Sequence, residues 1–208
     1  MYIPKHFEGS EAEGREIMKA HSWALLTTAD HAGAPVCTHL VLQWEDGGGP
    51  HGCLIGHMAR ANDHWTLFAK GTPSLALFWG PHAYVSPTWY TPGPKVPTWN
   101  YVTVHAYGRP EVVAATPAVL MVLTKLAAQY EGSGADAWGL GRLPPGNAAG
   151  QTQHIVAFRM KLDRIETKLK LSQNRELEDR HRVIAKLAAS DSQDAQATAR
   201  WMKRVLPE

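Results

Sequence analysis

The chain is poor in cysteine and has no long apolar run. It contains two cysteines in 208 residues, too few for a disulfide scaffold. Neither Cys37 nor Cys53 lies in a C-x-x-C pair, so we expect both to be buried thiols on strands. No segment reaches the roughly 20 apolar residues of a membrane-spanning helix, and residues 1–8 lack the apolar core of a secretion signal. We therefore expect a cytoplasmic protein that does not enter a membrane.

The familiar nucleotide and hydrolase motifs are also missing. The sequence has no P-loop, no GxGxxG, no GxSxG elbow and no recognisable catalytic triad. A strong excess of one charge is absent too, since the formal net charge is +2. Residues 1–158 carry 9 basic and 11 acidic side chains (9 − 11 = −2), and residues 159–208 carry 12 and 8 (12 − 8 = +4). The basic tail could face nucleic acid, but its bases alternate with acids, which favours a solvated helix face.

Aromatic residues, by contrast, are plentiful in the first half of the chain. Six of the eight Trp lie between Trp23 and Trp99. Many stand beside His, Tyr and Pro in two dense segments, residues 80–90 and 96–108. Packing alone favours aliphatic side chains at alternating strand positions. Rings that also form hydrogen bonds suit the wall of a pocket for a planar ligand, or they plug the end of a barrel.

Hydrophobic alternation predicts an antiparallel meander. The expected strands are residues 23–29, 34–44, 52–57, 75–79, 82–86, 99–113, 154–161 and 165–171. The segment Asp30-His31-Ala32-Gly33 is a turn between the first two. Strands joined mainly by short turns indicate a mainly β protein, an antiparallel barrel with peripheral helices.

Helices are expected around this barrel. Ser10 and Glu13 form a capping box that opens a helix ending before Trp23. Thr116 is read as the N-cap of a helix over 118–130, with Pro117 at its first position. Further helices are expected at 60–70, 176–189 and 195–205, and residues 132–150 read as a loop. We predict one domain overall, with the barrel at 1–175 and C-terminal helices packed on it at 176–208.

The segment His57-Met58-Ala59-Arg60-Ala61-Asn62 is a candidate anion site. Strand-to-helix turns leave backbone N–H groups free for an anion. Arg60 adds a planar cation that matches phosphate, and Asn62 can cap the helix or bind the same ligand. The alternative is that Asn62 only caps the helix and Arg60 is a surface residue.

Two other segments could reach a ligand. Thr38, His39 and Leu40 lie on a strand next to the His57 strand, although the sequence alone favours a half-buried strand with an outward His39. Lys170 and Gln173 stand where a strand gives way to a helix, and Ser172 or Asn174 could simply cap that helix. A metal site is not expected, because the histidines lack ligand spacing.

Five ordered segments together resemble the PaiB family of FMN-binding negative transcriptional regulators. They are Met1-Tyr-Ile-Pro-Lys-His-Phe7, Gly56-His-Met-Ala-Arg-Ala-Asn62, Gly80-Pro-His-Ala-Tyr84 with Ser86-Pro-Thr-Trp-Tyr90, Val96-Pro-Thr-Trp-Asn-Tyr101 with Val104-His-Ala106, and Lys170-Leu-Ser-Gln-Asn-Arg175. The resemblance runs from residue 1 to about residue 187.

The resemblance implies a homodimeric FMN-binding split β-barrel related to pyridoxamine phosphate oxidases, with FMN at the dimer interface. By analogy, Thr38, His39 and Leu40 would follow the isoalloxazine. The residues His57, Met58, Ala59, Arg60 and Asn62 would hold the ribityl chain and phosphate. Trp99 and Asn100 would come from the partner subunit, and Lys170, Ser172 and Gln173 would close the site.

Two functions follow from a bound flavin. The resemblance implies a repressor that acts through DNA or a regulatory protein partner. No helix-turn-helix supports direct DNA reading, since the linker Ser190-Asp-Ser-Gln-Asp194 has no groove-reading pattern. The alternative is a flavin-dependent oxidoreductase, because flavin supplies its own redox chemistry. His82, Tyr84 and His105 are its candidate proton donors, and none is assigned as catalytic from the sequence.

Overall fold

Six strands of the computed structural model close into a barrel, which confirms the mainly β architecture. The structure describes residues 1–132, 134, 136–144 and 146–207, and the strand order is β1-β2-β3-β6-β5-β4. The strands are β1 Trp23–Ala29, β2 Pro35–Glu45, β3 Cys53–Ala59, β4 Ser74–Val85, β5 Thr98–Val113 and β6 Ile155–Lys170. The α-helices are α1 Glu11–Ala20, α2 Thr116–Glu131, α3 Asn147–Gln151, α4 Leu177–Ala188 and α5 Gln193–Arg204. Short 3-10 helices are η1 Lys5–Phe7, η2 Asp63–Lys70, η3 Pro87–Trp89, η4 Leu140–Arg142 and η5 Thr152–His154.

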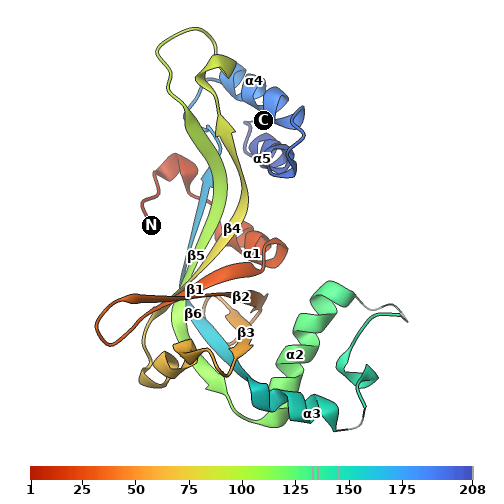
Figure 1. Cartoon of the computed structure of the whole chain (residues 1–208). Coiled ribbons are helices and arrows are strands. Elements are labelled where there is room, and N and C mark those ends of the chain that lie inside the picture. Colours follow the sequence, from red (N-terminus) through yellow and green to blue (C-terminus); the bar gives the residue numbers. More distant parts are fainter. Residues whose placement is uncertain (133, 135, 145, 208) are drawn as a thin grey trace. The chain divides into compact units, whose positions relative to one another are not determined.

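The chain folds as two compact units. Unit 1 comprises Met1–Ala20, Trp79–His105 and Glu166–Glu208, and unit 2 comprises His21–Phe78 and Ala106–Ile165. Strands β4, β5 and β6 each contribute one part to unit 1 and one to unit 2. In unit 1, α4 and α5 pair with each other, and in unit 2, α2 packs on β3 (Figure 1). The predicted boundary at residue 175 stays a prediction.

Alternation of side chains builds the interior of unit 2. On β1, Ala24, Leu26 and Thr28 are buried while the residues between them are more exposed. The turn predicted after β1 is confirmed: Oδ1 of Asp30 accepts the N–H groups of Ala32 and Ala34, both at 2.8 Å. In the resulting register, Thr28 of β1 lies opposite Val36 of β2 on one side and opposite Ser74 of β4 on the other.

A glycine lets β5 approach β6 closely. A Cβ at Gly108 would lie 2.1 Å from the carbonyl oxygen of Lys161. Hydrogen alone fits there, so β5 continues through Gly108 and Pro110 as one strand.

Several element predictions were wrong in detail. Segments 75–79 and 82–86 form one strand, as do 154–161 and 165–171, because pairing with neighbours carries each strand across its apparent break. Residues 60–70 contain a 3-10 helix that begins only at Asp63, and the expected loop contains α3. Helix α2 begins at Thr116, so its N-cap is Ala115 and no side chain caps it. Cys53 is buried as expected, but Cys37 is exposed, because its side chain falls on the outer face of β2.

The capping box of α1 is confirmed, and the proposed caps of α4 are not. The N–H of Ser10 donates to Glu13 Oε2 at 2.7 Å, and the N–H of Glu13 donates to Ser10 Oγ at 3.2 Å. The N-cap of α4 is Glu176, not Ser172 or Asn174. Every helix in the described part of the chain is too short or too polar to span a bilayer.

Candidate functional site

The turn after β3 is joined to β2 by a network of neutral hydrogen bonds in unit 2. Asn62 Nδ2 donates to Thr38 Oγ1 at 3.1 Å, and Thr38 Oγ1 also lies 2.8 Å from His64 Nδ1. The other ring nitrogen of His64 lies 2.8 Å from Thr28 Oγ1, which contacts Ser74 Oγ at 2.6 Å. Asn62 and Thr38, both predicted site residues, therefore contact each other. We call these five residues the His64 cluster.

His64 is the residue of this turn that the sequence pattern did not reveal. The residue is 2% exposed, and burial lowers the pKa of its imidazole, which is therefore neutral at pH 7. The only sequence signal is its position two residues after the cap Asn62, whose Oδ1 accepts the N–H of His64 at 3.1 Å. A buried imidazole bonded on both nitrogens fixes the position of Thr38 and hence of the β2 strand beside the turn.

Arg60 is exposed and held in a fixed orientation. Its Nε donates to the carbonyl of Gln153 and its Nη2 to that of Ile155, both at 2.8 Å. These two contacts leave other guanidinium N–H groups for an anion, since Arg carries five. The guanidinium carbon lies 6.0 Å from the centre of the Trp65 ring, which further orients it.

The backbone of this turn is less open to an anion than its sequence indicated. The N–H of Arg60 donates to the carbonyl of His154 at 2.9 Å, and the N–H of Asn62 donates to that of Ala59 at 3.0 Å. Both groups are therefore used inside the protein, because β3 continues to Ala59 and pairs with β6. Any anion bound here depends mainly on the Arg60 side chain.

The remaining predicted residues of unit 2 lie on different faces of their strands. His39 is exposed on the outer face of β2, where its ring stacks on Trp23 with centroids 6.3 Å apart and an interplanar angle of 20°. Leu40 and Met58 point into the buried interior, and Ala59 is exposed at the end of β3. Side chains on opposite faces cannot line one site together, so Leu40 and Met58 can only offer main-chain atoms.

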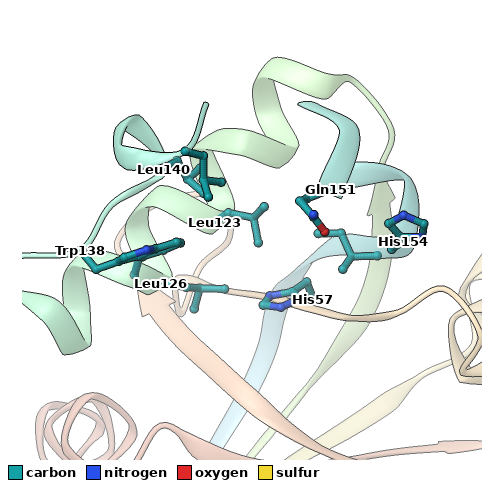
Figure 2. A pocket seen from close by; sticks show the side chains of 10 residues that line it. His57, Leu123, Leu126, Trp138, Leu140, Gln151 and His154 are labelled. Atoms are coloured by element: carbon teal, nitrogen blue, oxygen red, sulfur yellow. The ribbon is translucent and has the colours of Figure 1, made fainter. Parts of the chain in front are cut away.

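His57 faces a cavity of about 490 Å³ in unit 2. Figure 2 shows Leu123 and Leu126 of α2 pointing towards His57, with Trp138 and Leu140 on one side and His154 on the other. Nδ1 of His57 is buried and has no hydrogen-bond partner among the described residues. Burial also lowers the pKa of this imidazole, which keeps it uncharged.

The predicted residues of unit 1 form a separate group. Asn100 is completely buried; its Nδ2 donates to Ser172 Oγ at 2.9 Å, and that oxygen in turn lies 3.2 Å from Asn100 Oδ1. Lys170 donates to Thr98 Oγ1 at 2.6 Å, and its pKa is lowered by burial and by the charges of Lys168 and Arg175. These groups line a small cavity of about 110 Å³.

Gln173 and Ser172 shape the turn that follows β6. Oε1 of Gln173 accepts the N–H of Leu171 at 2.8 Å, and its Nε2 donates to the carbonyl of Leu169 at 2.6 Å. Ser172 has a φ of 66°, the one positive φ of a non-glycine residue in the described chain. The side chain of Gln173 thus stabilises the conformation of its own turn through these two hydrogen bonds.

Trp99 lies beside the predicted donors His82 and Tyr84. Its ring is 6.2 Å from that of His82 and 6.0 Å from that of Tyr84, and it is 52% exposed. All three line a cavity of about 540 Å³ in unit 1. His105, the third candidate donor, does not line this cavity. The described residues contain no group of three or more His, Cys, Asp or Glu side chains placed to hold a metal ion.

Comparisons with known proteins agree on a flavin-binding fold. A family model described as "Putative FMN-binding domain" matches residues 1–164. The "Protease synthase and sporulation protein PAI 2" of Bacillus subtilis is 33% identical over 204 residues, which cover 98% of this chain and 97% of that protein. The uncharacterized protein YKL070W of Saccharomyces cerevisiae is 28% identical over 134 residues, covering 54% and 79%.

Solved structures match the fold at much lower sequence identity. The flavocytochrome Anf3 from Azotobacter vinelandii superposes with a TM-score of 0.64 at 12% identity, covering 86% of this chain and 77% of that one. A FAD and heme binding protein from Mycobacterium smegmatis gives 0.60 at 15% identity, covering 83% and 77%. These likenesses concern the backbone arrangement.

Proposed function

Because the chain belongs to the PaiB family of FMN-binding proteins, we propose that it is a regulatory flavoprotein that holds FMN non-covalently between two copies. FMN is the cofactor that the family description names. The observation that carries the proposal is the exposed Arg60, fixed by two carbonyls at the end of β3. A flavin phosphate needs such a preset cation.

The residues of unit 2 fit FMN as a ligand. The phosphate would bind Arg60, with Thr38 and Asn62 next to it, and the isoalloxazine would follow β2 on the face that carries His39. His57, Met58, Ala59 and Leu40 would contribute main-chain groups of the two strands. The stacked rings of Trp23 and His39 supply an exposed flat surface on that face. When bound, the flavin supplies redox chemistry, while these residues bind and orient it.

The residues of unit 1 would close the site from the other copy. Trp99 offers an exposed ring, and Lys170 a cation whose position is set by Thr98. Asn100, Ser172 and Gln173 are bonded to one another or to their own turn, so they would support these two residues rather than touch the flavin.

Titration of FMN into purified protein tests the phosphate site. Arg60→Ala removes a charge-assisted contact of about 1.5–3 kcal/mol and weakens FMN binding by about one to two orders of magnitude. Arg159→Ala is the matched control, since Arg159 is also exposed, lies on β6 and has its guanidinium facing Glu45. Equal affinities of wild type and Arg60→Ala would remove Arg60 from the site.

The dimer is supported by Trp23, which is 59% exposed on the outer face of β1. A Trp side chain with more than half of its surface exposed to solvent is typical of a protein–protein interface. Light scattering after size-exclusion chromatography should give twice the mass of one chain, and Trp23→Glu should shift it towards one chain. A wild-type protein with the mass of a single chain contradicts the proposal.

The regulatory role rests on the full-length likeness to the Bacillus subtilis sporulation protein. DNA or a regulatory protein is the proposed partner. Fluorescence anisotropy with DNA fragments from the genomic neighbourhood of this protein's gene tests whether the protein binds DNA. Binding should be detectable at low salt and should weaken steeply as salt is added. An anisotropy that does not change with protein concentration at any salt concentration excludes binding to these DNA fragments, and a regulatory protein is then the remaining partner.

A flavin-dependent oxidoreductase is the second candidate. It is favoured by the cavity of about 540 Å³ in which His82 and Tyr84 flank Trp99, because two proton-carrying groups beside an aromatic wall suit a planar substrate. Anaerobic mixing of flavin-loaded protein with NADH or NADPH provides the test. Loss of the flavin absorbance within seconds supports an enzyme, and an unchanged spectrum excludes nicotinamide as the donor.

A further inference from the structure

The small cavity in unit 1 carries positive charge without a counter-ion. Lys170 and Arg175 both line it, and no Asp or Glu is among its described lining residues. Among the described residues, neither cation forms an ion pair, and the guanidinium of Arg175 has no hydrogen-bond acceptor. Burial and the charges of Lys168 and Arg175 all lower the pKa of Lys170. An anion would offset this repulsion between like charges. We call this space the Lys170–Arg175 cavity.

The two cations are already oriented in the absence of a ligand. Nζ of Lys170 donates to Thr98 Oγ1 at 2.6 Å and also to the carbonyl oxygen of Trp99, so one of its three N–H groups is left for a ligand. The guanidinium carbon of Arg175 lies 5.2 Å from the centre of the Tyr90 ring. A ring face at that distance orients a guanidinium without using its N–H groups. Side chains that are fixed beforehand lose little rotational freedom when a ligand binds.

The volume of the cavity limits the ligand to a small group. About 110 Å³ is several times what a single water molecule needs, but it is well below the roughly 300 Å³ at which sites for drug-sized ligands begin. An isoalloxazine ring system therefore does not fit, whereas a carboxylate or a phosphate group does. Asn100 and Ser172, both buried and bonded to each other, form a neutral polar part of the wall.

We propose that the Lys170–Arg175 cavity binds one small oxyanion, a carboxylate or a phosphate group, through the guanidinium of Arg175 and the remaining N–H of Lys170. A planar guanidinium matches two oxygens of either group. All described lining residues belong to unit 1, so the site is complete within one chain. Lys170 is shared with the proposed flavin site, but the flavin phosphate is placed at Arg60 in unit 2, and the oxyanion is a ligand separate from it.

Isothermal titration calorimetry with inorganic phosphate, acetate and neutral acetamide tests the site. The full chain is loaded with FMN first, so that the flavin phosphate already occupies Arg60. Wild type should bind phosphate and acetate, and acetamide should bind about tenfold more weakly than acetate, because hydrogen bonds to a charged group are stronger than those to a neutral one. Equal affinities for acetate and acetamide overturn the proposal.

Variants of Arg175 locate the binding. Arg175→Gln removes the guanidinium charge and should weaken phosphate binding about tenfold or more, whereas Arg175→Lys keeps a charge and should lose less. Arg182→Gln is the matched control, since Arg182 lies in the same unit on α4, pairs with Glu178 and is not among the described lining residues. Phosphate affinity that is unchanged in Arg175→Gln contradicts the proposal.

A measurement on the wild-type protein keeps the proposal testable if Arg175→Gln does not fold. The side-chain nitrogen resonance of Lys170 should shift as phosphate is added, while that of Lys186, which is exposed on α4, should not. A Lys170 resonance that stays in place at saturating phosphate refutes the contact.

The remaining source of such an anion is the phosphate of FMN itself. Arg60→Ala should weaken FMN binding and leave phosphate binding intact, and Arg175→Gln should do the reverse. If Arg175→Gln weakens FMN binding and free phosphate does not bind the FMN-loaded chain, the cavity holds the flavin phosphate and the separate site is refuted. If instead Arg60→Ala leaves FMN binding unchanged while Arg175→Gln weakens only free phosphate, the assignment of Arg60 fails and the oxyanion site stands.

Discussion

The two units bury polar groups in opposite ways. In unit 2, the His64 cluster consists of five neutral side chains joined by hydrogen bonds of 2.6–3.1 Å. In unit 1, Asp179 is 1% exposed and ionised, with Lys95 Nζ at 2.6 Å from Oδ2 and the N–H of Thr91 at 2.7 Å from Oδ1. We call these three residues the Asp179 cluster.

The difference shows how each unit avoids an unpaired buried charge. His64 sheds its proton, since burial lowers its pKa. Burial acting alone would raise the pKa of Asp179, but the hydrogen bonds from Lys95 and Thr91 and the charge of Lys95 lower it further than burial raises it. The neutral cluster needs only hydrogen-bond partners, whereas the charged cluster needs its counter-ion. Removing one member should therefore cost more in unit 1.

The largest effect is expected from Asp179→Ala, which leaves Lys95 partly buried without its counter-ion. Breaking a buried pair costs about 3–5 kcal/mol, and we expect the lower end because Lys95 retains 17% exposure. Urea unfolding measures the loss. The double variant Asp179→Leu with Lys95→Met should recover most of it, and equal losses in the single and double variants would contradict the charge argument.

A smaller loss is expected from Thr28→Val in the neutral cluster. The change removes the partner of His64 Nε2 and of Ser74 Oγ and costs about 1–3 kcal/mol. Thr27→Val is the control next to it, since Thr27 faces outward and, among the described residues, its hydroxyl contacts only Cys37 Sγ, at 3.4 Å. A control loss as large as that of Thr28→Val would mean that strand propensity, rather than the cluster, sets the effect.

The pH dependence should separate the two clusters. His64 has a folded pKa below its usual 6.5, so the unfolded chain takes up the proton first, and stability falls as pH drops through 6.5 towards the folded pKa. Asp179 has a folded pKa below its usual 3.8, so its contribution is present above 3.8 and disappears as pH falls through the folded value. In melting temperatures from pH 8 to pH 3, His64→Asn should reduce the upper slope, to which His57 also contributes, and Asp179→Asn should reduce the lower slope, to which Glu16 also contributes. A wild-type profile that is flat between pH 7 and pH 5 would count against a buried neutral His64.

The smallest effect is expected at the surface of unit 1. Arg204 holds Glu16 through two contacts of 2.6 and 2.8 Å, but both side chains are nearly half exposed. Such pairs contribute at most about 1 kcal/mol and are weakened by salt. Arg204→Ala should therefore change the unfolding free energy less than Thr28→Val, and the difference from wild type should shrink in 1 M salt. A loss as great as that of Asp179→Ala would mean that Arg204 does more than hold Glu16, for example through its contact with the Trp201 ring.

Local pattern was sufficient for the elements whose signals lie within a few residues. The capping box at Ser10 and Glu13 and the turn at Asp30 both depend on side chains that bond their own neighbours in the chain. The strands predicted at 34–44 and 52–57 were placed to within about two residues, because alternation along a strand is also a local signal. The family likeness, too, could be read from ordered segments without coordinates.

Sites that need distant partners were predicted less well. The role of His64 could not be predicted from the sequence. Its partner Thr28 contacts Ser74, which lies 46 residues further along the chain, and the two meet only through the register of β1 on β4. Asn100 and Ser172 were predicted to face a cofactor, yet they bond each other across 72 residues. The contribution of Asn100 to a flavin site from a second copy stays a prediction.

The sequence by itself determined the mainly β fold, the flavin family and an arginine at the end of β3. Only the tertiary structure decided which face each side chain takes. Alternation along a strand is visible in the sequence, but which half of it is buried depends on what packs against the strand. Helix α2 packs on β3, and its residues Leu123 and Leu126 line the apolar cavity that His57 faces. The residues next to His57 in the sequence cannot reveal that environment.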